Sequence, residues 1–270
     1  IHRRTHRKAI IIDGSIGYIG GINVQDVWLG NGKSKDQWRD IMFEMHGNMA
    51  ESLQSSFVDV WTEMTGEVLV GPKYYPLVDN LYKGFSPDKP FFLHIISTPT
   101  AEVEPVRNVF YLSVLGSTTT LYITDPYLLP DPELLKAIEQ KAKDGVDVRI
   151  LLPEKNDSKV VRWASQKNYE SLLTSGVRIY EYQPTMIHLK TMVVDGKWSI
   201  IGSANLDSRS RILNNESIMG VLDQSLAGEL NTDFIENLKL SKEITLKNGG
   251  KQNVFKALRS RLASLFAKQY

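Results

Sequence analysis

One pattern occurs twice in this chain of 270 residues and constrains its architecture more than any other feature. The segment HRKAIIIDG begins at His6, and HLKTMVVDG begins at His188. Each copy continues through a second apolar run to a small-residue segment that ends in Asn23 or Asn205. Two copies with the same internal spacing predict two related halves of one protein.

Each copy has the composition of a β-hairpin. The apolar runs Ala9–Ile12 and Met192–Val194 end at Asp-Gly, which is a strong turn signal, and the return strands follow directly. The histidine and lysine of each motif are two residues apart, so on a strand they project from the same face. The asparagines fall on the next loop, where neighbouring glycines let the backbone approach a ligand.

Strand and helix signals alternate before the second copy. The strands are expected at Leu121–Thr124, Val146–Leu152 and Val177–Tyr182, and the helices at Pro132–Lys143 and Ser158–Ser175. This β-α-β-α-β run predicts an α/β protein with mixed sheets flanked by helices. Only five residues precede His6, so we expect a first repeat that lacks its own run, on the order of 80–100 residues.

These patterns divide the chain into four parts. We expect residues 1–64 to form the C-terminal part of the first repeat and residues 105–240 to form the second repeat. Residues 65–104 are the connection, which is long enough to carry short strands of its own. Residues 241–270 form an amphipathic C-terminal tail.

Two His-x-Lys units that face each other suit the chemistry of a phosphodiester. One neutral imidazole can attack phosphorus while the other, protonated, gives a proton to the leaving oxygen. Lys8 and Lys190 supply positive charge for the non-bridging oxygens, and Asn23 and Asn205 supply amide donors. This chemistry needs no metal and no cofactor.

Each histidine requires an acid to fix its tautomer. Asp13 and Asp195 lie too far along their strands and are expected to serve the turns. Asp40 and Glu216, which begin the next strands, are better candidates. We expect Asp40 beside His6 and Glu216 beside the second histidine.

The paired motifs resemble those of the phospholipase D superfamily. The segments around Gly20–Asn23, Trp38–Asp40, Tyr122–Asp131 and Gly202–Ser210 are similar to those of bacterial cardiolipin synthases. The resemblance implies a two-lobed phospholipase D fold with a pseudo-two-fold repeat, and ping-pong transfer through a phosphohistidine. It also implies that His6 is the nucleophile and His188 the general acid. The catalytic motif residues are then His6, Lys8, Asp13, His188, Lys190 and Asp195, supported by Asn23, Asp40, Asn205 and Glu216.

We therefore expect a phosphatidyltransferase that moves a phosphatidyl group between phospholipids. The alternative is a phospholipase D-type hydrolase or a nucleic-acid phosphodiesterase that uses the same two histidines. A net charge of +1, without a long basic run, favours an anionic phospholipid such as phosphatidylglycerol over nucleic acid. Spacing does not distinguish phosphatidylglycerol, phosphatidylethanolamine and water as the second substrate, and nothing indicates the oligomeric state.

Two further segments have alternative interpretations. Tyr127 follows a strand at the edge where α/β sheets bind ligands, so it either contacts substrate or packs. Asn253–Ala267 has an apolar stripe among basic residues, so it either docks on the protein or rests on anionic lipid. The lipid interpretation predicts a peripheral protein on the cytoplasmic face of the bacterial cell membrane. Any transmembrane anchor would then precede Ile1.

Overall fold

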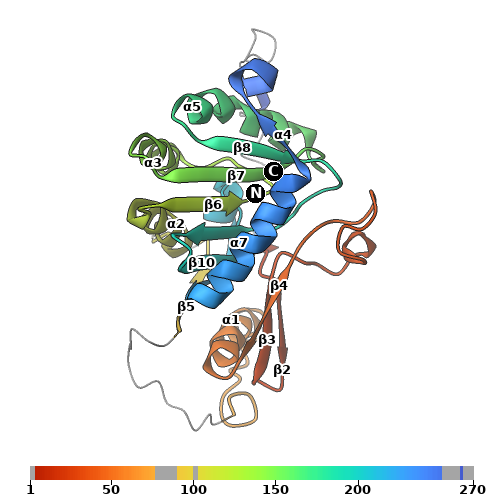
Figure 1. Ribbon diagram of the computed structural model, residues 1–270. Coiled ribbons are helices and arrows are strands. Elements are labelled where there is room, and N and C mark those ends of the chain that lie inside the picture. Colours follow the sequence, from red (N-terminus) through yellow and green to blue (C-terminus); the bar gives the residue numbers. More distant parts are fainter. Residues whose placement is uncertain (1–3, 77–89, 100–102, 251–261, 264–270) are drawn as a thin grey trace.

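The computed structural model describes residues 4–76, 90–99, 103–250 and 262–263. Within these ranges the chain forms a small first lobe and a larger second lobe, which lie against each other (Figure 1). The elements of the first lobe are β2 (Ala9–Ile12), β3 (Ile16–Gly20), the short 3-10 helix Asp26–Trp28, β4 (Met42–His46) and α1 (Asn48–Thr65).

The second lobe contains one large sheet and most of the helices. Its strands are β5 (Phe91–Ser97), β6 (Thr120–Thr124), β7 (Asp147–Pro153), β8 (Arg178–Tyr182), β9 (Thr191–Val194), β10 (Trp198–Gly202), β11 (Asn214–Leu222) and β12 (Ser241–Ile244), and the sheet also takes β1 (Arg4–Thr5). Its helices are α2 (Pro105–Gly116), α3 (Pro132–Lys143), α4 (Lys159–Ser165), the 3-10 turn Gln166–Asn168, α5 (Tyr169–Thr174), α6 (Ser208–Ile212), α7 (Gln224–Lys239) and the π turn Leu246–Gly250.

The large sheet is mixed, as the sequence predicts. Its order is β1-β11-β10-β9-β6-β7-β8-β12, with β5 also paired to β11. Strands β6, β7 and β8 are parallel, whereas β9, β10 and β11 form an antiparallel meander. The carboxyl ends of β6 and β7 therefore open toward the same edge, where α/β sheets place ligands.

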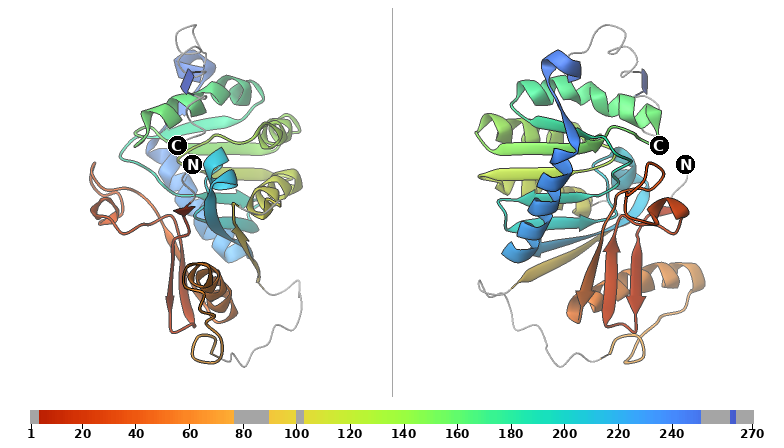
Figure 2. Two further views of the ribbon diagram at one scale, coloured as in Figure 1. Left: turned by 180° about the vertical axis from the view of Figure 1, so that it is seen from behind. Right: turned by 45° about the vertical axis from the view of Figure 1, so that its right-hand side comes forward.

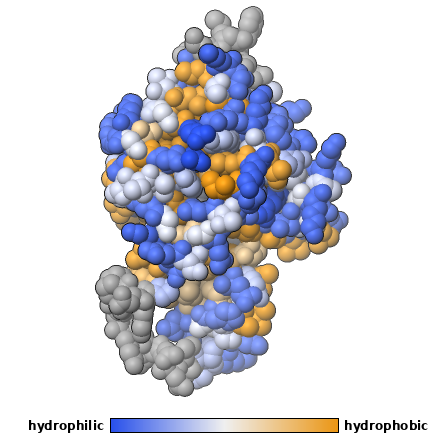
Figure 3. Space-filling view, in the orientation of Figure 1, coloured by the Kyte–Doolittle hydropathy of each residue, from blue (hydrophilic) through white to orange (hydrophobic). Residues whose placement is uncertain are grey.

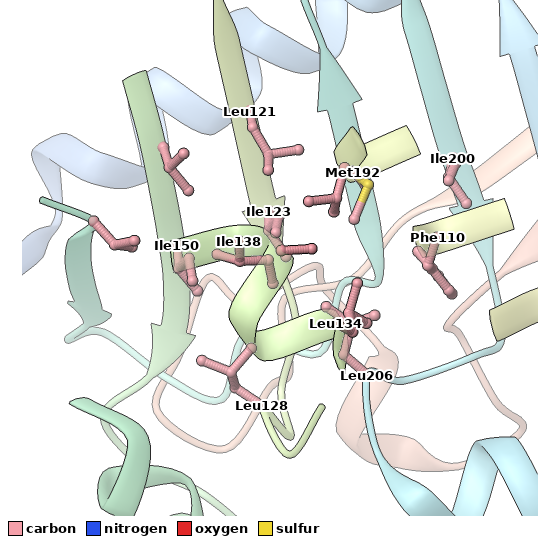
Figure 4. Packing of buried hydrophobic residues seen from close by; sticks show 14 of the residues in the cluster. Phe110, Leu121, Ile123, Leu128, Leu134, Ile138, Ile150, Met192, Ile200 and Leu206 are labelled. Atoms are coloured by element: carbon pink, nitrogen blue, oxygen red, sulfur yellow. The ribbon is translucent and has the colours of Figure 1, made fainter. Parts of the chain in front are cut away.

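Helices cover both faces of the large sheet. Side chains of β6 alternate, so Leu121 and Ile123 face α2 and α3, while Tyr122 stacks on Phe234 of α7. Figure 4 shows the first of these layers, in which Ile138 and Leu134 of α3 lie over the strands. The two other views place α7 on the opposite side of the sheet from α2 and α3 (Figure 2).

Local sequence signals account for these boundaries. Helix α3 covers the predicted range, and the carboxylate of Asp131 accepts hydrogen bonds from the amides of Glu133 and Leu134 at its N-terminus. The helix predicted at Ser158–Ser175 is instead divided into α4 and α5 by the polar turn Gln166–Asn168. Strand β5 lies within the connection and pairs with β11 over seven residues.

The first lobe contains a three-stranded antiparallel sheet, β2-β3-β4, packed on α1. In the described part of the chain β2 pairs only with β3, so it is an edge strand. Ile10 and Ile12 on this strand are 56% and 45% exposed. Figure 3 shows the face that carries α7 as mostly hydrophilic, with separate hydrophobic patches on both lobes.

The predicted tail helix lies almost entirely outside the described residues. Only Leu262 and Ala263 of that range are described, and Ala263 is buried against Ala164 of α4. In the described part of the chain, no helix combines the length and the apolar character that crossing a membrane requires.

Candidate active site

Backbone pairing between the lobes places the first histidine. Strand β1 runs parallel to β11, and the amide of His6 donates to the carbonyl oxygen of Asn215 at 2.9 Å. Residue 216 is therefore next to His6. The Nδ1 atom of His6 lies 2.9 Å and 3.1 Å from the two carboxylate oxygens of Glu216.

The second histidine is held in the same way, but here the histidine belongs to the second lobe and its backbone partner to the first. The amide of His188 donates to the carbonyl oxygen of Arg39 at 2.7 Å, beside an isolated parallel bridge between Arg39 and Ile187. The Nδ1 atom of His188 lies 2.8 Å from Oδ2 of Asp40. Asp40 and Glu216 are only 3% and 0% exposed, so both histidine–carboxylate pairs are shielded from water.

The expected pairing of acids with histidines is therefore wrong. Asp40 was expected beside His6 and Glu216 beside His188, but each carboxylate binds the histidine of the other repeat. The cause is the strand pairing: the segments that carry the histidines pair with the acid-bearing segments of the opposite lobe, not with their own. The acids themselves are the two that the sequence singled out.

Asp13 and Asp195 serve their turns, as expected. Both have positive φ angles, 51° and 52°, at the tips of the motif hairpins. The carboxylate of Asp195 accepts the backbone N–H groups of Thr118, Thr119 and Thr120 at the start of β6. In the described structure this aspartate contacts the strand start rather than the imidazole.

The two lysines point their ammonium groups back toward their own histidines. Lys8 donates to the carbonyl oxygen of His6 at 2.9 Å, and Lys190 donates to that of His188 at 2.7 Å. The Lys190 ammonium also lies 3.0 Å and 3.1 Å from the ring nitrogens of His188. Burial, followed by the charge of Lys190, lowers the pKa of Lys8 to about 8.

Both imidazoles have a lowered affinity for protons. Burial, together with the nearby Lys190 ammonium, lowers the pKa of His188 to about 4 against the opposing effect of Asp40. Burial also lowers the pKa of His6, with Glu216 again opposing the shift. Because each Nδ1 faces a carboxylate, the neutral tautomer carries its proton there, which leaves the Nε2 lone pair of His6 available.

A cavity of about 490 Å³ lies between the two histidines, and both line it. His6, Lys8 and Asn23 form part of its wall from the first repeat, and His188 and Asn205 from the second. The side-chain oxygen of Asn205 is buried without a hydrogen-bond partner in the described structure. Such a buried polar atom is costly unless a ligand completes its hydrogen bonding.

Two tryptophans were not assigned a role from the sequence. The rings of Trp28 and Trp38 lie 5.7 Å and 5.2 Å from the ring of His188, and both line the cavity. The indole N–H of Trp28 also donates to Oδ2 of Asp40 at 3.2 Å. Trp38 belongs to the Trp-Arg-Asp segment that carries the family resemblance, so the sequence pointed to it. No local signal linked Trp28 to His188.

Histidine, lysine and amide groups of the site can supply a nucleophile and positive charge. Among the described residues, no three histidine, aspartate or glutamate side chains gather as a group able to hold a metal ion.

Comparisons with known proteins agree with this geometry. Residues 111–238 match the family described as "Cardiolipin synthase, PLD-like domain". Cardiolipin synthase 2 of Staphylococcus epidermidis is 33% identical over 270 residues, which cover 99% of this chain and 54% of that protein. Cardiolipin synthase of a Geobacillus species is 36% identical over 244 residues, which cover 90% of this chain and 48% of that protein. The chain thus spans about half the length of these curated relatives.

Solved structures show the same fold. The phosphatidylserine synthase of Haemophilus influenzae matches with a TM-score of 0.72 at 17% identity, over 98% of this chain and 69% of that one. The phospholipase D family member Nuc of Salmonella typhimurium matches with a TM-score of 0.52 at 18% identity, over 58% of this chain and 99% of that one.

The matched phospholipase D-like domain and the sequence relatives place the chain in the phospholipase D superfamily, so that resemblance is confirmed. Within the superfamily, the sequence relatives are bacterial cardiolipin synthases, which confirms the narrower resemblance as well.

Proposed function

We propose that this protein is a cardiolipin synthase-like phosphatidyltransferase. One observation carries the proposal: two imidazoles, each oriented by a buried carboxylate of the opposite lobe, share one cavity with Lys8, and the Lys190 ammonium lies against the ring of His188. This arrangement supplies a nucleophile, an acid and fixed positive charge for one phosphodiester. We further propose the four-part division at residues 64, 104 and 240.

In the first step Nε2 of His6 attacks the phosphorus of a phosphatidylglycerol. The P–N bond forms as the bond from phosphorus to the headgroup oxygen breaks, and glycerol leaves with a proton from His188. Glu216 fixes the proton of His6 on Nδ1, so the attacking lone pair is already oriented. Lys8, Lys190 and the two asparagines stabilise the negative charge on the non-bridging oxygens.

The state of His188 requires explanation, because an imidazole with a pKa of about 4 is neutral at pH 7. The anionic phosphodiester brings negative charge into the cavity and thereby raises the affinity of His188 for a proton. His188 then takes up its proton together with the substrate. Asp40, on its Nδ1 side, stabilises the imidazolium that results.

In the second step a hydroxyl of another phosphatidylglycerol attacks the phosphohistidine. His188 accepts the hydroxyl proton, the P–N bond breaks, and cardiolipin is released. Attack by water in place of this lipid gives phosphatidic acid, which is the hydrolase alternative. We place the protein peripherally on the cytoplasmic face of the membrane, where both lipids are presented, and expect no nucleic-acid partner.

The test is to incubate the protein separately with phosphatidylglycerol vesicles and with labelled single-stranded DNA. We expect cardiolipin and glycerol from the vesicles and no cleavage of the DNA. Phosphatidic acid as the sole lipid product would support the hydrolase instead, and DNA cleavage without lipid turnover would support the nuclease.

A further inference from the structure

A tyrosine and an aspartate form a hydrogen-bonded pair on the cavity wall. Tyr127 follows β6 and Asp157 follows β7, so both stand at the carboxyl ends of neighbouring parallel strands. The phenol oxygen of Tyr127 donates to the carboxylate of Asp157, whose oxygens lie at 2.8 Å and 3.0 Å. Both residues line the cavity that holds the two histidines.

The loops that carry this pair are held in place by hydrogen bonds to neighbouring loops. The carboxylate of Asp125 accepts the amide of Tyr127 at 2.7 Å and the amide of Leu206 at 2.8 Å. The side-chain amide of Asn156 donates to the carbonyl oxygen of Pro126 at 2.8 Å. The Tyr127 loop is thus tied to both neighbouring loops, which makes the pair a preorganised part of the wall.

The pair lies on the side of the cavity where the headgroup leaves. The ring of Tyr127 is 6.1 Å from the ring of His188 and nearly perpendicular to it. In the proposed function His188 protonates the departing headgroup oxygen, so the rest of that headgroup lies beside Tyr127. Burial foremost, and then the charge of Asp157, raise the pKa of the phenol, which therefore stays protonated as a donor.

The charges on the wall decide between two kinds of headgroup. Among the lining residues described, the cavity has four basic side chains, Arg4, Arg7, Lys8 and Arg209. It has only two carboxylates among them, Asp157 and Asp207. This excess of positive charge disfavours an ammonium headgroup but not a neutral polyol. The carboxylate of Asp157 is exposed and still has acceptor capacity for hydroxyl groups.

We propose that Tyr127 and Asp157 bind the free hydroxyls of a glycerol headgroup and so select glycerol over other alcohols. The proposal rests on the phosphatidyl transfer proposed above and names the residues that choose its headgroup. A site built to hydrogen-bond a hydroxyl discriminates strongly against an analogue that lacks it, because its polar groups are then left without partners.

The test is a competition between acceptor alcohols. The protein is given phosphatidylglycerol with equal concentrations of deuterated glycerol, 1-propanol and ethanolamine, and mass spectrometry measures the three lipid products. Wild type should favour deuterated phosphatidylglycerol over both alternatives. Tyr127→Phe and Asp157→Asn should each lower the ratio of the glycerol product to the propanol product by about tenfold.

The pair Tyr18 and Glu44 offers a matched control. There a phenol also donates to a carboxylate, at 2.7 Å, but both residues are on the sheet of the first lobe and not on the cavity wall. Tyr18→Phe and Glu44→Gln should leave the product ratio unchanged. If either primary variant fails to fold, Asp157→Glu takes its place. It keeps a carboxylate acceptor, so it should lower the ratio of glycerol product to propanol product by less than tenfold.

Three outcomes overturn the proposal while leaving the proposed function standing. They are equal losses of the glycerol and propanol products in Tyr127→Phe, a ratio unchanged by Asp157→Asn, and a wild type that prefers ethanolamine. A wild type that forms none of the three products and no cardiolipin contradicts phosphatidyl transfer itself, so the two failures are distinguishable.

Discussion

Asp40 and Glu216 perform matching tasks but differ by one methylene, and the residue beside each accommodates the difference. A Cβ atom added to Gly21 would lie only 2.4 Å from Oδ2 of Asp40, so no side chain fits there. Ser203, at the matching place, instead donates its hydroxyl to Oε2 of Glu216 at 2.5 Å. The Gly-Gly and Gly-Ser versions of the motif are therefore each fitted to the acid that lies next to them.

The division of labour between the histidines can be tested through the leaving group. His188→Ala should cripple turnover of phosphatidylglycerol, because an alkoxide needs protonation, a contribution of typically 10²–10⁴-fold. The same variant should still load phosphate from a nitrophenyl phosphodiester, since nitrophenolate leaves without a proton. His6→Ala should abolish loading from both substrates. Mass spectrometry of quenched digests, kept away from acid, locates the phosphorylated peptide.

The opposite pattern would reverse the assignment. Phosphate on the peptide that contains His188, with His6→Ala still loading, makes His188 the nucleophile and leaves the two-histidine mechanism intact.

The lowered pKa of Lys8 predicts a loss of activity in mild alkali. A lysine is charged below its pKa, so Lys8 loses its charge as the pH rises through about 8, and with it the attraction for the phosphodiester. We expect kcat/KM of the wild type to fall above this pH. Lys8→Arg stays charged, so its kcat/KM should not show that fall. An alkaline limb at the same pH in Lys8→Arg would assign it to another group.

At the scale of elements, a single turn residue fixes how a hairpin joins the parallel part of the sheet. Asp195 follows β9, and its carboxylate accepts hydrogen bonds from the amides of Thr119 and Thr120, where the neighbouring strand β6 begins. Burial opposes its ionisation, but these backbone N–H groups and the hydroxyls of Thr118 and Thr119 outweigh burial and lower its pKa below the ordinary range. The carboxylate thus binds the strand start most strongly when it is ionised.

Removing this carboxylate should therefore destabilise the sheet. We expect Asp195→Ala to lower the free energy of unfolding by about 2 kcal/mol, because charge-assisted hydrogen bonds to three backbone amides are lost. The depressed pKa means that the stabilisation is present at neutral pH and is lost on acidification below about 4. Chemical denaturation at pH 7 and at pH 3 measures both effects. An equal difference between variant and wild type at the two pH values would contradict this account.

The elements show how much local sequence could predict. Helix α3 and strands β6 to β10 follow from apolar periodicity, the Asp131 cap and the Asp-Gly turns, which are all local signals. The repeat identified the histidines, lysines and both acids of the site. The exchange of the acids was not predictable, because it depends on β1 pairing with β11 and Arg39 with Ile187 across the lobes. Such long-range pairing leaves no trace in the spacing of either motif.

At the scale of the molecule, one buried arginine on the cavity wall links the lobes. Arg7 donates to the carbonyl oxygen of Ser56 and the carboxylate of Asp59 on α1, at 2.9 Å and 3.1 Å. It also donates to the carbonyl oxygens of Ser97 on β5, at 3.2 Å, and of Glu216 on β11, at 3.3 Å. Its side chain is only 4% exposed, and the three residues whose carbonyl oxygens it binds are buried, so water does not replace it at these oxygens.

Replacing this arginine should loosen the contact between the lobes. We expect Arg7→Met to lower the free energy of unfolding by roughly 2–4 kcal/mol, because it leaves buried carbonyl groups without donors. Hydrogen exchange should rise in α1 and β5 but not in α3. Arg178→Met is the matched control: its ion pair with Glu243 is 45% and 42% exposed, so its loss should cost under about 1 kcal/mol. Uniform exchange across all helices in Arg7→Met would count against a role specific to the lobe interface.

The exchange of acids between the lobes has a consequence for how such a chain can change over generations. The carboxylate that orients His6 is 210 residues away in the sequence, in the other copy of the repeat. A substitution of Glu216 therefore alters the chemistry of the first motif and leaves the histidine of its own copy oriented. Each copy supplies the acid that orients the other copy's histidine, so neither copy can evolve a separate function without impairing the other. The two halves of the duplication are therefore inherited as one unit.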